Sequence, residues 1–214
     1  MKKNKNPKPE DKPIEYKLLL IGESNVGKTT IFNKYIFNKL DKNTGSTIGV
    51  DFEAKNFSYK NKKYSIKLFD TAGQERFHSV TRAYYHMGDA YLIVFDLTNE
   101  NSLKEIPNWI NSLKAEKEDS KFIILGNKSD LKNQISQDVI NEYLKDYKHL
   151  LIKTSAIKNE NIKESIYKII DLIEGDDNNL ENKDDNDEQN ENVIKISKKI
   201  GKTRDNSKSK VKCC

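Results

Sequence analysis

The stretch from Gly22 to Thr29, GESNVGKT, restricts the possible folds of this chain more than any other feature. It matches the pattern G-x-x-x-x-G-K-[ST] and lies between the apolar run 16–21 and a stretch of helical character. Glycines at these places let backbone N–H groups wrap a phosphate, and the start of the following helix adds partial positive charge. A bare glycine turn would not explain why Lys28 and Thr29 follow, since their side chains suit phosphates and Mg²⁺. The sequence therefore predicts a strand, a phosphate-binding loop and a helix, in that order.

Strand-like and helical patterns alternate through the rest of the core. The predicted strands are 16–21, 51–59, 64–69, 90–96, 121–127 and 150–155, and the predicted helices are 102–116, 136–147 and 161–174. The runs 90–96 and 121–127 are nearly all apolar, as in central strands covered on both faces. The second and third strands are joined by KNKK, which predicts a hairpin. The alternation predicts an α/β fold with a doubly wound, mostly parallel six-stranded sheet and one antiparallel strand near its edge.

Apolar content divides the chain into three parts. Residues 1–13 and 176–214 hold too few apolar groups to offset the entropy of ordering them. We therefore expect a disordered N-terminal extension, a folded domain at 14–175 and a disordered tail. The tail is first acidic and then basic, so its charge alone suits nucleic acid, an anionic membrane or no partner at all.

The cysteines and apolar runs indicate the compartment. Cys213 and Cys214 are the only cysteines, so the core has no disulfide and no cysteine-bound metal. No apolar run approaches the ~20 residues needed to span a bilayer, and the N-terminus lacks the apolar segment of a secretory signal. These features predict a cytoplasmic chain.

Three further segments follow strands at the edge of the sheet where doubly wound folds bind ligands. Asp70, in FDTAGQERF, ends the third strand, where an acidic side chain lies near the metal of phosphate-binding loops. Asp130, in GNKSD, can accept two hydrogen bonds from guanine, whereas adenine offers no such donor pair. The segment TSA at 154–156 follows the sixth strand, where a backbone N–H can meet the guanine carbonyl. Together these segments predict a guanine nucleotide.

From Tyr16 to about Glu174 the chain resembles the Rab family of the Ras superfamily of small GTPases. The segments that carry this resemblance are IGVDF (48–52), DTAGQERF (70–77) and YYHMGDAYLIVFDLT (84–98), together with the terminal pair of cysteines. The resemblance implies the small G-protein form of the P-loop NTPase fold. It also implies a GTP/GDP switch that uses Mg²⁺, hydrolyses GTP slowly and recruits effectors to membranes in vesicle trafficking.

The resemblance further implies a role for each matching residue. Gln74 would orient the attacking water, with Lys28 and Gly73 at the γ-phosphate. Thr29 and Thr47 would bind Mg²⁺, with Asp70 close to the ion. The nucleotide would be held by Ser24, Asn25, Val26, Gly27, Lys28, Thr29, Thr30, Thr47, Gly73, Asn127, Lys128, Asp130, Ser155, Ala156 and Ile157. The apolar surface for effectors would comprise Ile48, Phe52, Leu68, Phe69, Phe77 and Tyr84.

Three positions depart from the family pattern. Ile157 replaces a lysine, which would be displaced to Lys158 in this chain, and Leu40 stands where relatives often place an aromatic ring against the base. Phe69 stands where most Rab proteins have tryptophan. The first two changes lead to the hypothesis that guanine is held more loosely and exchanged faster.

The catalytic side chains that the core contains favour a switch that hydrolyses GTP slowly. No arginine of the core is placed at the β–γ phosphate bridge, so an activating protein would supply one, which accelerates the Ras relative by ~10³–10⁵. The alternatives are a GTP/GDP-binding membrane scaffold with negligible hydrolysis, an ATP-dependent phosphotransferase and a nucleic-acid binder. The scaffold is opposed by Gln74, Thr47 and Gly73, and the phosphotransferase by NKSD.

The terminal Cys213 and Cys214 match a pattern that Rab proteins use for attachment of two prenyl groups. Two lipid chains give stable membrane anchoring, so a membrane replaces nucleic acid as the expected partner of the tail. The resemblance also implies an exchange factor, a GTPase-activating protein, a GDP-dissociation inhibitor, an escort protein and effectors. We expect a monomeric core that cycles from the cytoplasm onto the cytosolic face of an intracellular membrane.

Overall fold

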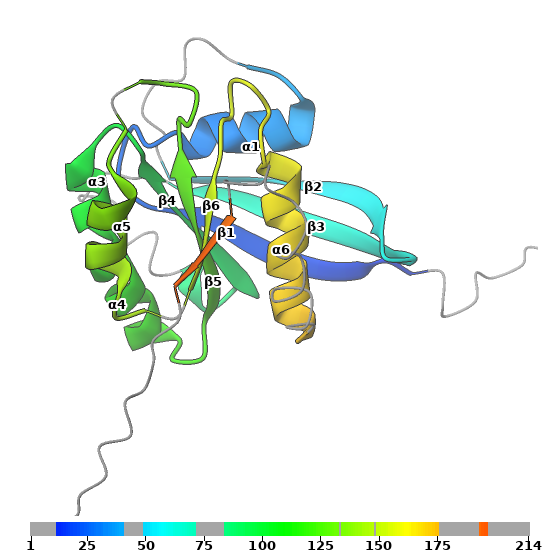
Figure 1. The fold of residues 1–214 in the computed structure, drawn as a ribbon. Coiled ribbons are helices and arrows are strands. Elements are labelled where there is room, and N and C mark those ends of the chain that lie inside the picture. The colour runs from blue at the N-terminus through cyan, green and yellow to red at the C-terminus, as the bar shows by residue number, and fades with distance from the viewer. Residues whose placement is uncertain are drawn as a thin grey trace, which may run out of the picture.

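The computed structural model describes residues 12–40, 49–71, 84–132, 134–147 and 149–175, and the backbone of 193–196. One sheet runs through the molecule with helices on both faces (Figure 1). In spatial order its strands are β2 (Val50–Tyr59), β3 (Lys62–Thr71), β1 (Ile14–Ile21), β4 (Ala90–Asp96), β5 (Lys121–Asn127), β6 (His149–Lys153) and β7 (Val193–Ile196). The pairs β2–β3 and β6–β7 are antiparallel and the other neighbours are parallel. The doubly wound, mostly parallel sheet is confirmed.

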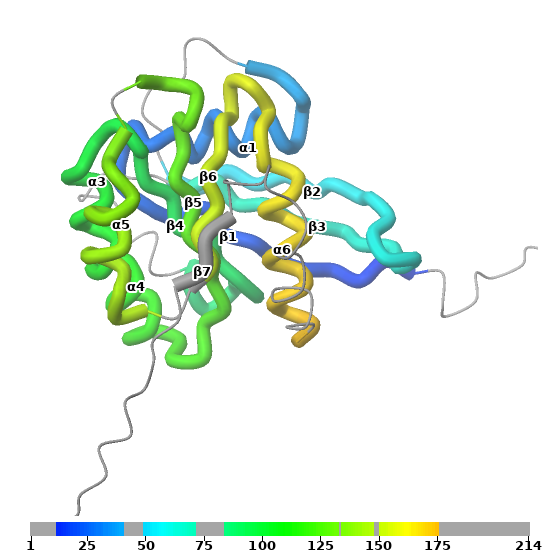
Figure 2. Tube along the Cα trace, viewed as in Figure 1, coloured from blue at the N-terminus to red at the C-terminus, as the bar shows by residue number. Residues whose placement is uncertain are grey.

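The helices form two layers, each closing its own hydrophobic cluster. On one face lie α1 (Lys28–Phe37) and α6 (Ile162–Glu174), which are close together in the tube view (Figure 2). On the other lie α3 (Glu100–Lys104), α4 (Ile106–Glu116) and α5 (Gln137–Leu144) (Figure 1). Each central strand supplies alternate residues to the two clusters: in β1, Leu18 and Leu20 face the first and Leu19 and Ile21 the second. None of the helices in the described ranges is long and apolar enough to cross a membrane.

The single helix predicted over 102–116 is two helices in the structure. Glu105 separates α3 from α4, and Pro107 lies in the first turn of α4. A proline in the middle of a helix would clash with the carbonyl four residues earlier and would remove one hydrogen bond, whereas the first turn tolerates it. Asn99 caps α3 by accepting a hydrogen bond from the backbone N–H of Asn101 at 3.1 Å.

The β2–β3 hairpin turns at two residues, Lys60 and Asn61, both with positive φ. Such a two-residue turn matches the natural twist of the strands, so the strands extend further than the predicted 51–59 and 64–69. The turn is tied to α6, since Lys60 Nζ lies 2.7 Å from Asp171 Oδ1 and the Tyr59 hydroxyl donates to Asp171 Oδ2 at 3.0 Å. This contact fixes the far end of β2, the strand that carries Phe52.

A seventh strand comes from the segment predicted as disordered tail. Residues 193–196, VIKI, pair antiparallel with β6, with Ile194 opposite Leu151. Without this pairing β6 would be an edge strand with unpaired N–H and C=O groups, and three of the four residues in VIKI are β-branched. The low average hydrophobicity of 176–214 hides this short stretch, so the six-strand prediction lacked one strand.

Pairing with β7 is expected to slow hydrogen exchange of the β6 backbone amides. The double variant Ile194→Pro/Lys195→Pro should restore fast exchange at 150–152, because successive residues of a strand point their N–H groups to opposite sides and one of the two must donate to β6. Exchange measured by mass spectrometry on the full chain tests this, with Ser207→Pro as control. Equal exchange at 150–152 in all three proteins would contradict the pairing.

Candidate functional site

The loop between β1 and α1 approaches its neighbours so closely that two positions accept only glycine. Gly22 has φ +136°, and a Cβ there would lie 2.2 Å from the carbonyl oxygen of Val94 in β4. Gly27 has φ +96°, and a Cβ there would lie 2.4 Å from Asn127 Nδ2. Ser24 and Asn25 form the exposed tip of the loop. The glycines therefore seat the loop against β4 and β5.

Lys28, the first residue of α1, is buried and folds back over the loop. Its Nζ donates hydrogen bonds to the carbonyl oxygens of Gly22 and Glu23, each at 2.7 Å. Burial lowers the pKa of this lysine to about 8, against the opposing effect of the Asp70 and Glu23 carboxylates. A phosphate beside Nζ would favour the charged form, so the site suits a strongly anionic ligand.

Thr29 and Asp70 bring two oxygen donors together next to Lys28. The Thr29 hydroxyl donates to Asp70 Oδ2 at 2.7 Å, and the Asp70 side chain is almost completely buried. Hydroxyl and carboxylate oxygens are the ligand types that Mg²⁺ prefers. The residues present therefore fit the predicted Mg²⁺ ion. Thr30, which was predicted to contact the nucleotide, follows in α1 and is partly buried.

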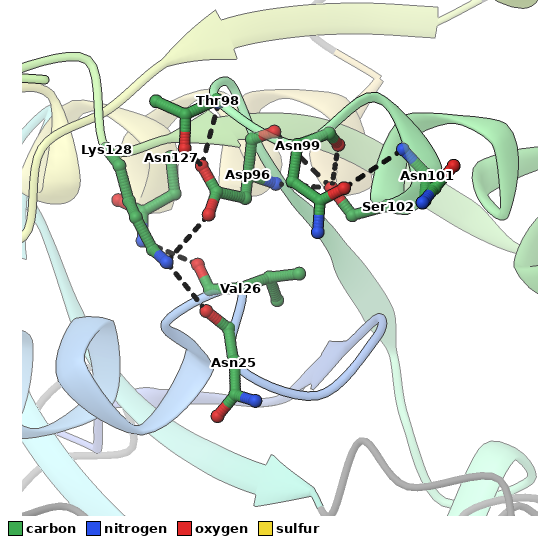
Figure 3. A network of polar contacts seen from close by, with 9 residues as sticks. All are labelled: Asn25, Val26, Asp96, Thr98, Asn99, Asn101, Ser102, Asn127 and Lys128. Carbon is green, nitrogen blue, oxygen red and sulfur yellow. Dashed lines mark hydrogen bonds and ion pairs between the residues drawn. The ribbon is translucent and has the colours of Figure 1, made fainter. Parts of the chain in front are cut away.

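Two residues at the end of β5, Asn127 and Lys128, hold the phosphate-binding loop from the other side (Figure 3). Asn127, which is buried, donates from Nδ2 to the carbonyl oxygen of Val26 at 2.8 Å. Lys128 donates from Nζ to the carbonyl oxygen of Asn25 at 2.8 Å. The two predicted base-binding residues thus bind the backbone of the predicted phosphate-binding loop, across about a hundred positions of sequence.

Asp96, at the end of β4, was not predicted as a site residue. Its Oδ2 lies 2.7 Å from Lys128 Nζ and its Oδ1 accepts hydrogen bonds from the Thr98 backbone and side chain (Figure 3). Burial raises the pKa of Asp96, but Lys128 and Thr98 outweigh it, so the pKa is lowered overall and the charge persists. The signal that revealed Asp70, an acidic residue ending an apolar strand, was also present here.

Asp130 and Ser155, both predicted to bind the base, lie in contact with each other. The Ser155 hydroxyl donates to Asp130 Oδ1 at 2.6 Å and accepts from the Lys158 backbone N–H at 3.0 Å. Ser155 and Ala156 are buried, whereas Ile157 is 61% exposed and Leu40 is 41% exposed. The two side chains that depart from the family pattern, Ile157 and Leu40, are thus both apolar and exposed to solvent.

Two residues predicted on the effector surface are buried. Leu68 is fully buried in one hydrophobic cluster and Phe69 is only 4% exposed in the other, because β3 lies between β2 and β1 and is covered on both faces. The exposed member is Phe52, at 56%, and its ring stacks on Phe69 at a centroid distance of 5.1 Å. Tyr84 is half-buried, and its ring also contacts that of Phe69, at a centroid distance of 6.5 Å. The prediction was therefore wrong for Leu68 and Phe69 as surface residues.

Other predicted residues cannot be placed. Those outside the described ranges are Thr47, Ile48, Gly73, Gln74, Phe77, Cys213 and Cys214. The roles assigned to them remain predictions.

Comparison with known proteins agrees with this geometry. The model of the Ras family matches residues 17–175. Ras-related protein Rab-32D of Dictyostelium discoideum is 36% identical over 209 residues, which cover 91% of this chain and 92% of the relative. Human Ras-related protein Rab-8B is 37% identical over 155 residues, covering 71% and 75%. The chain therefore belongs to the Ras family and is a Rab-like small GTPase.

Proposed function

We propose that this chain binds GTP and GDP with Mg²⁺ and hydrolyses GTP slowly, as a switch that recruits effectors to an intracellular membrane. Members of the family bind guanine nucleotides with Mg²⁺ and hydrolyse GTP. The observation that carries the proposal to this chain is the pair of bonds from Asn127 and Lys128 to the carbonyls of Val26 and Asn25. These bonds join the proposed base-binding residues, Asn127 and Lys128, to the phosphate-binding loop. We call the loop together with residues 127–130 the cradle.

Each residue of the cradle has a chemical role in this proposal. Asp130 accepts two hydrogen bonds from guanine, and its bond from Ser155 holds the carboxylate in place. Lys28 neutralises phosphate charge, and the backbone N–H groups of the loop add to it. Thr29 would hold Mg²⁺ with Thr47, and the ion would offset the charge that develops between the β- and γ-phosphates.

Gln74 would orient the water that attacks the γ-phosphorus, while Gly73 and Thr47 would bind the γ-phosphate. Loss of that phosphate would then release both segments at once, which is how nucleotide state becomes a change of surface. Phe52 and Tyr84, beside the buried Phe69, would form the described part of the effector surface. Prenyl groups on Cys213 and Cys214 would hold the protein at the membrane.

Single-turnover hydrolysis by the full chain tests the enzyme assignment. We expect slow cleavage of GTP and none of ATP, loss of cleavage in EDTA, and a decrease of about 10-fold or more in Gln74→Leu, since leucine cannot orient the attacking water. Gln137→Leu is the matched control, because Gln137 lies on α5 and bonds Asn141.

The other outcomes separate the alternatives. Tight GTP binding without cleavage, and without an effect of Gln74→Leu, would indicate the membrane scaffold. Equal use of ATP would overturn the guanine assignment that rests on Asp130.

A further inference from the structure

A tryptophan outside the nucleotide-binding motifs contacts the phosphate-binding loop. Trp109 Nε1, on α4, donates a hydrogen bond to Glu23 Oε1 at 3.1 Å, across 86 positions of sequence. Trp109 is the only tryptophan of the chain and is 4% exposed. Its ring packs in the hydrophobic cluster of α4 and β4, and its N–H points out of that cluster to the loop.

Glu23 connects this bond to the phosphate-binding lysine. While its side chain accepts from Trp109, its backbone carbonyl accepts from Lys28 Nζ at 2.7 Å. A residue held at both its carboxylate and its carbonyl has little freedom to rotate. The direction of the carbonyl that holds Lys28 is therefore linked to the indole of Trp109.

The other contacts to the loop have a different origin. The carbonyls of Asn25 and Val26 accept from Lys128 and Asn127, which belong to the base-binding segment, and the carbonyls of Gly22 and Glu23 accept from Lys28 itself. The bond from Trp109, in contrast, reaches the loop from α4, a helix that carries no nucleotide motif.

We propose that Trp109 is a positioning residue for nucleotide binding: through Glu23 it fixes the loop carbonyl that orients Lys28 toward the phosphates. This inference rests on the proposed function. The N–H of a buried indole needs a hydrogen-bond partner even where it serves only the stability of the fold. The test must therefore separate an effect on nucleotide binding from an effect on stability.

Three variants of the full chain make that separation. Trp109→Phe keeps an aromatic ring but removes the N–H, Glu23→Ala removes the acceptor, and Glu23→Gln keeps an acceptor oxygen and should behave as a rescue. We expect Trp109→Phe and Glu23→Ala to release a fluorescent GDP analogue about tenfold faster than the wild type. Glu23→Gln should release it at nearly the wild-type rate. Glu118→Ala, in the exposed loop after α4, is the control for the lost charge.

The indole gives a direct second measurement. A ¹⁵N-labelled chain has one indole N–H signal, which we expect to move in Glu23→Ala, to stay near its place in Glu23→Gln, and to shift when GDP is added. An unchanged indole signal in Glu23→Ala, or wild-type GDP release by both Trp109→Phe and Glu23→Ala, would overturn the proposal. Failure of the wild type to prefer GDP over ADP would instead overturn the proposed function.

Discussion

Asp130→Asn is expected to change the base preference of the site from guanine to xanthine. Guanine presents two donors, N1–H and the amino group, and a carboxylate accepts from both. Asparagine offers one acceptor and one donor, so its amide N–H would face the guanine amino group, donor to donor. One lost charge-assisted hydrogen bond, at about 1.5–3 kcal/mol, and one donor left unpaired, at about 1–3 kcal/mol, correspond to a loss of about 10²–10⁴ in GTP affinity.

Xanthine replaces that amino group with a carbonyl, which matches the asparagine amide. The bond from the Ser155 hydroxyl, 2.6 Å from Asp130 Oδ1 in the wild type, can still be accepted by the asparagine oxygen, so the pocket keeps its shape. Competition of GTP and xanthosine triphosphate for bound fluorescent nucleotide measures the preference. Asp119→Asn removes the same charge from an exposed loop and should change neither affinity. Equal loss of both nucleotides in Asp130→Asn would mean that Asp130 supports the loop and does not contact the base.

Features with a local cause could be predicted from the sequence. The bounds of β4 and β5 agree with the predicted apolar runs at 90–96 and 121–127, because burial on both faces leaves an uninterrupted apolar signal. The phosphate-binding loop was also found from a local signal, since its glycines, Lys28 and Thr29 form one motif within eight consecutive residues. Pro107 also carried a local signal, a helix start, that the apolar periodicity of 102–116 concealed.

Features that depend on a distant partner could not be predicted. Phe69 is buried in part because the rings of Phe52 and Tyr84, which come from other segments of the chain, pack against its ring, and no property of its neighbours in sequence reveals this. The bond from Trp109 to Glu23 and the ion pair of Asp96 with Lys128 exist only when separate strands and helices meet. The pairing of 193–196 with β6 is similar, since the exposed strand edge that attracts it is a property of the folded sheet.

Gly22→Ala is expected to lower the free energy of unfolding by about 2–6 kcal/mol and to abolish detectable nucleotide binding. Alanine would keep the strained positive φ, at about 1–3 kcal/mol, and its Cβ would lie 2.2 Å from the Val94 carbonyl oxygen, which adds an overpacking cost of about 1–3 kcal/mol. Val94 is buried in the central strand β4, so the loop must move instead. Movement of Gly22 displaces the carbonyl that accepts from Lys28 Nζ, so the lysine would no longer be held in place for phosphate binding.

Gly175→Ala separates the two contributions. Gly175 also has positive φ, +73°, but a Cβ there would meet nothing within 4 Å, and it lies at the end of α6. The control should therefore cost only the backbone strain, about 1–2 kcal/mol, and should bind GDP like the wild type. Urea unfolding and GDP titration of both variants measure the difference. If the two lose stability equally and Gly22→Ala still binds GDP, close packing of the loop on β4 does not form the site.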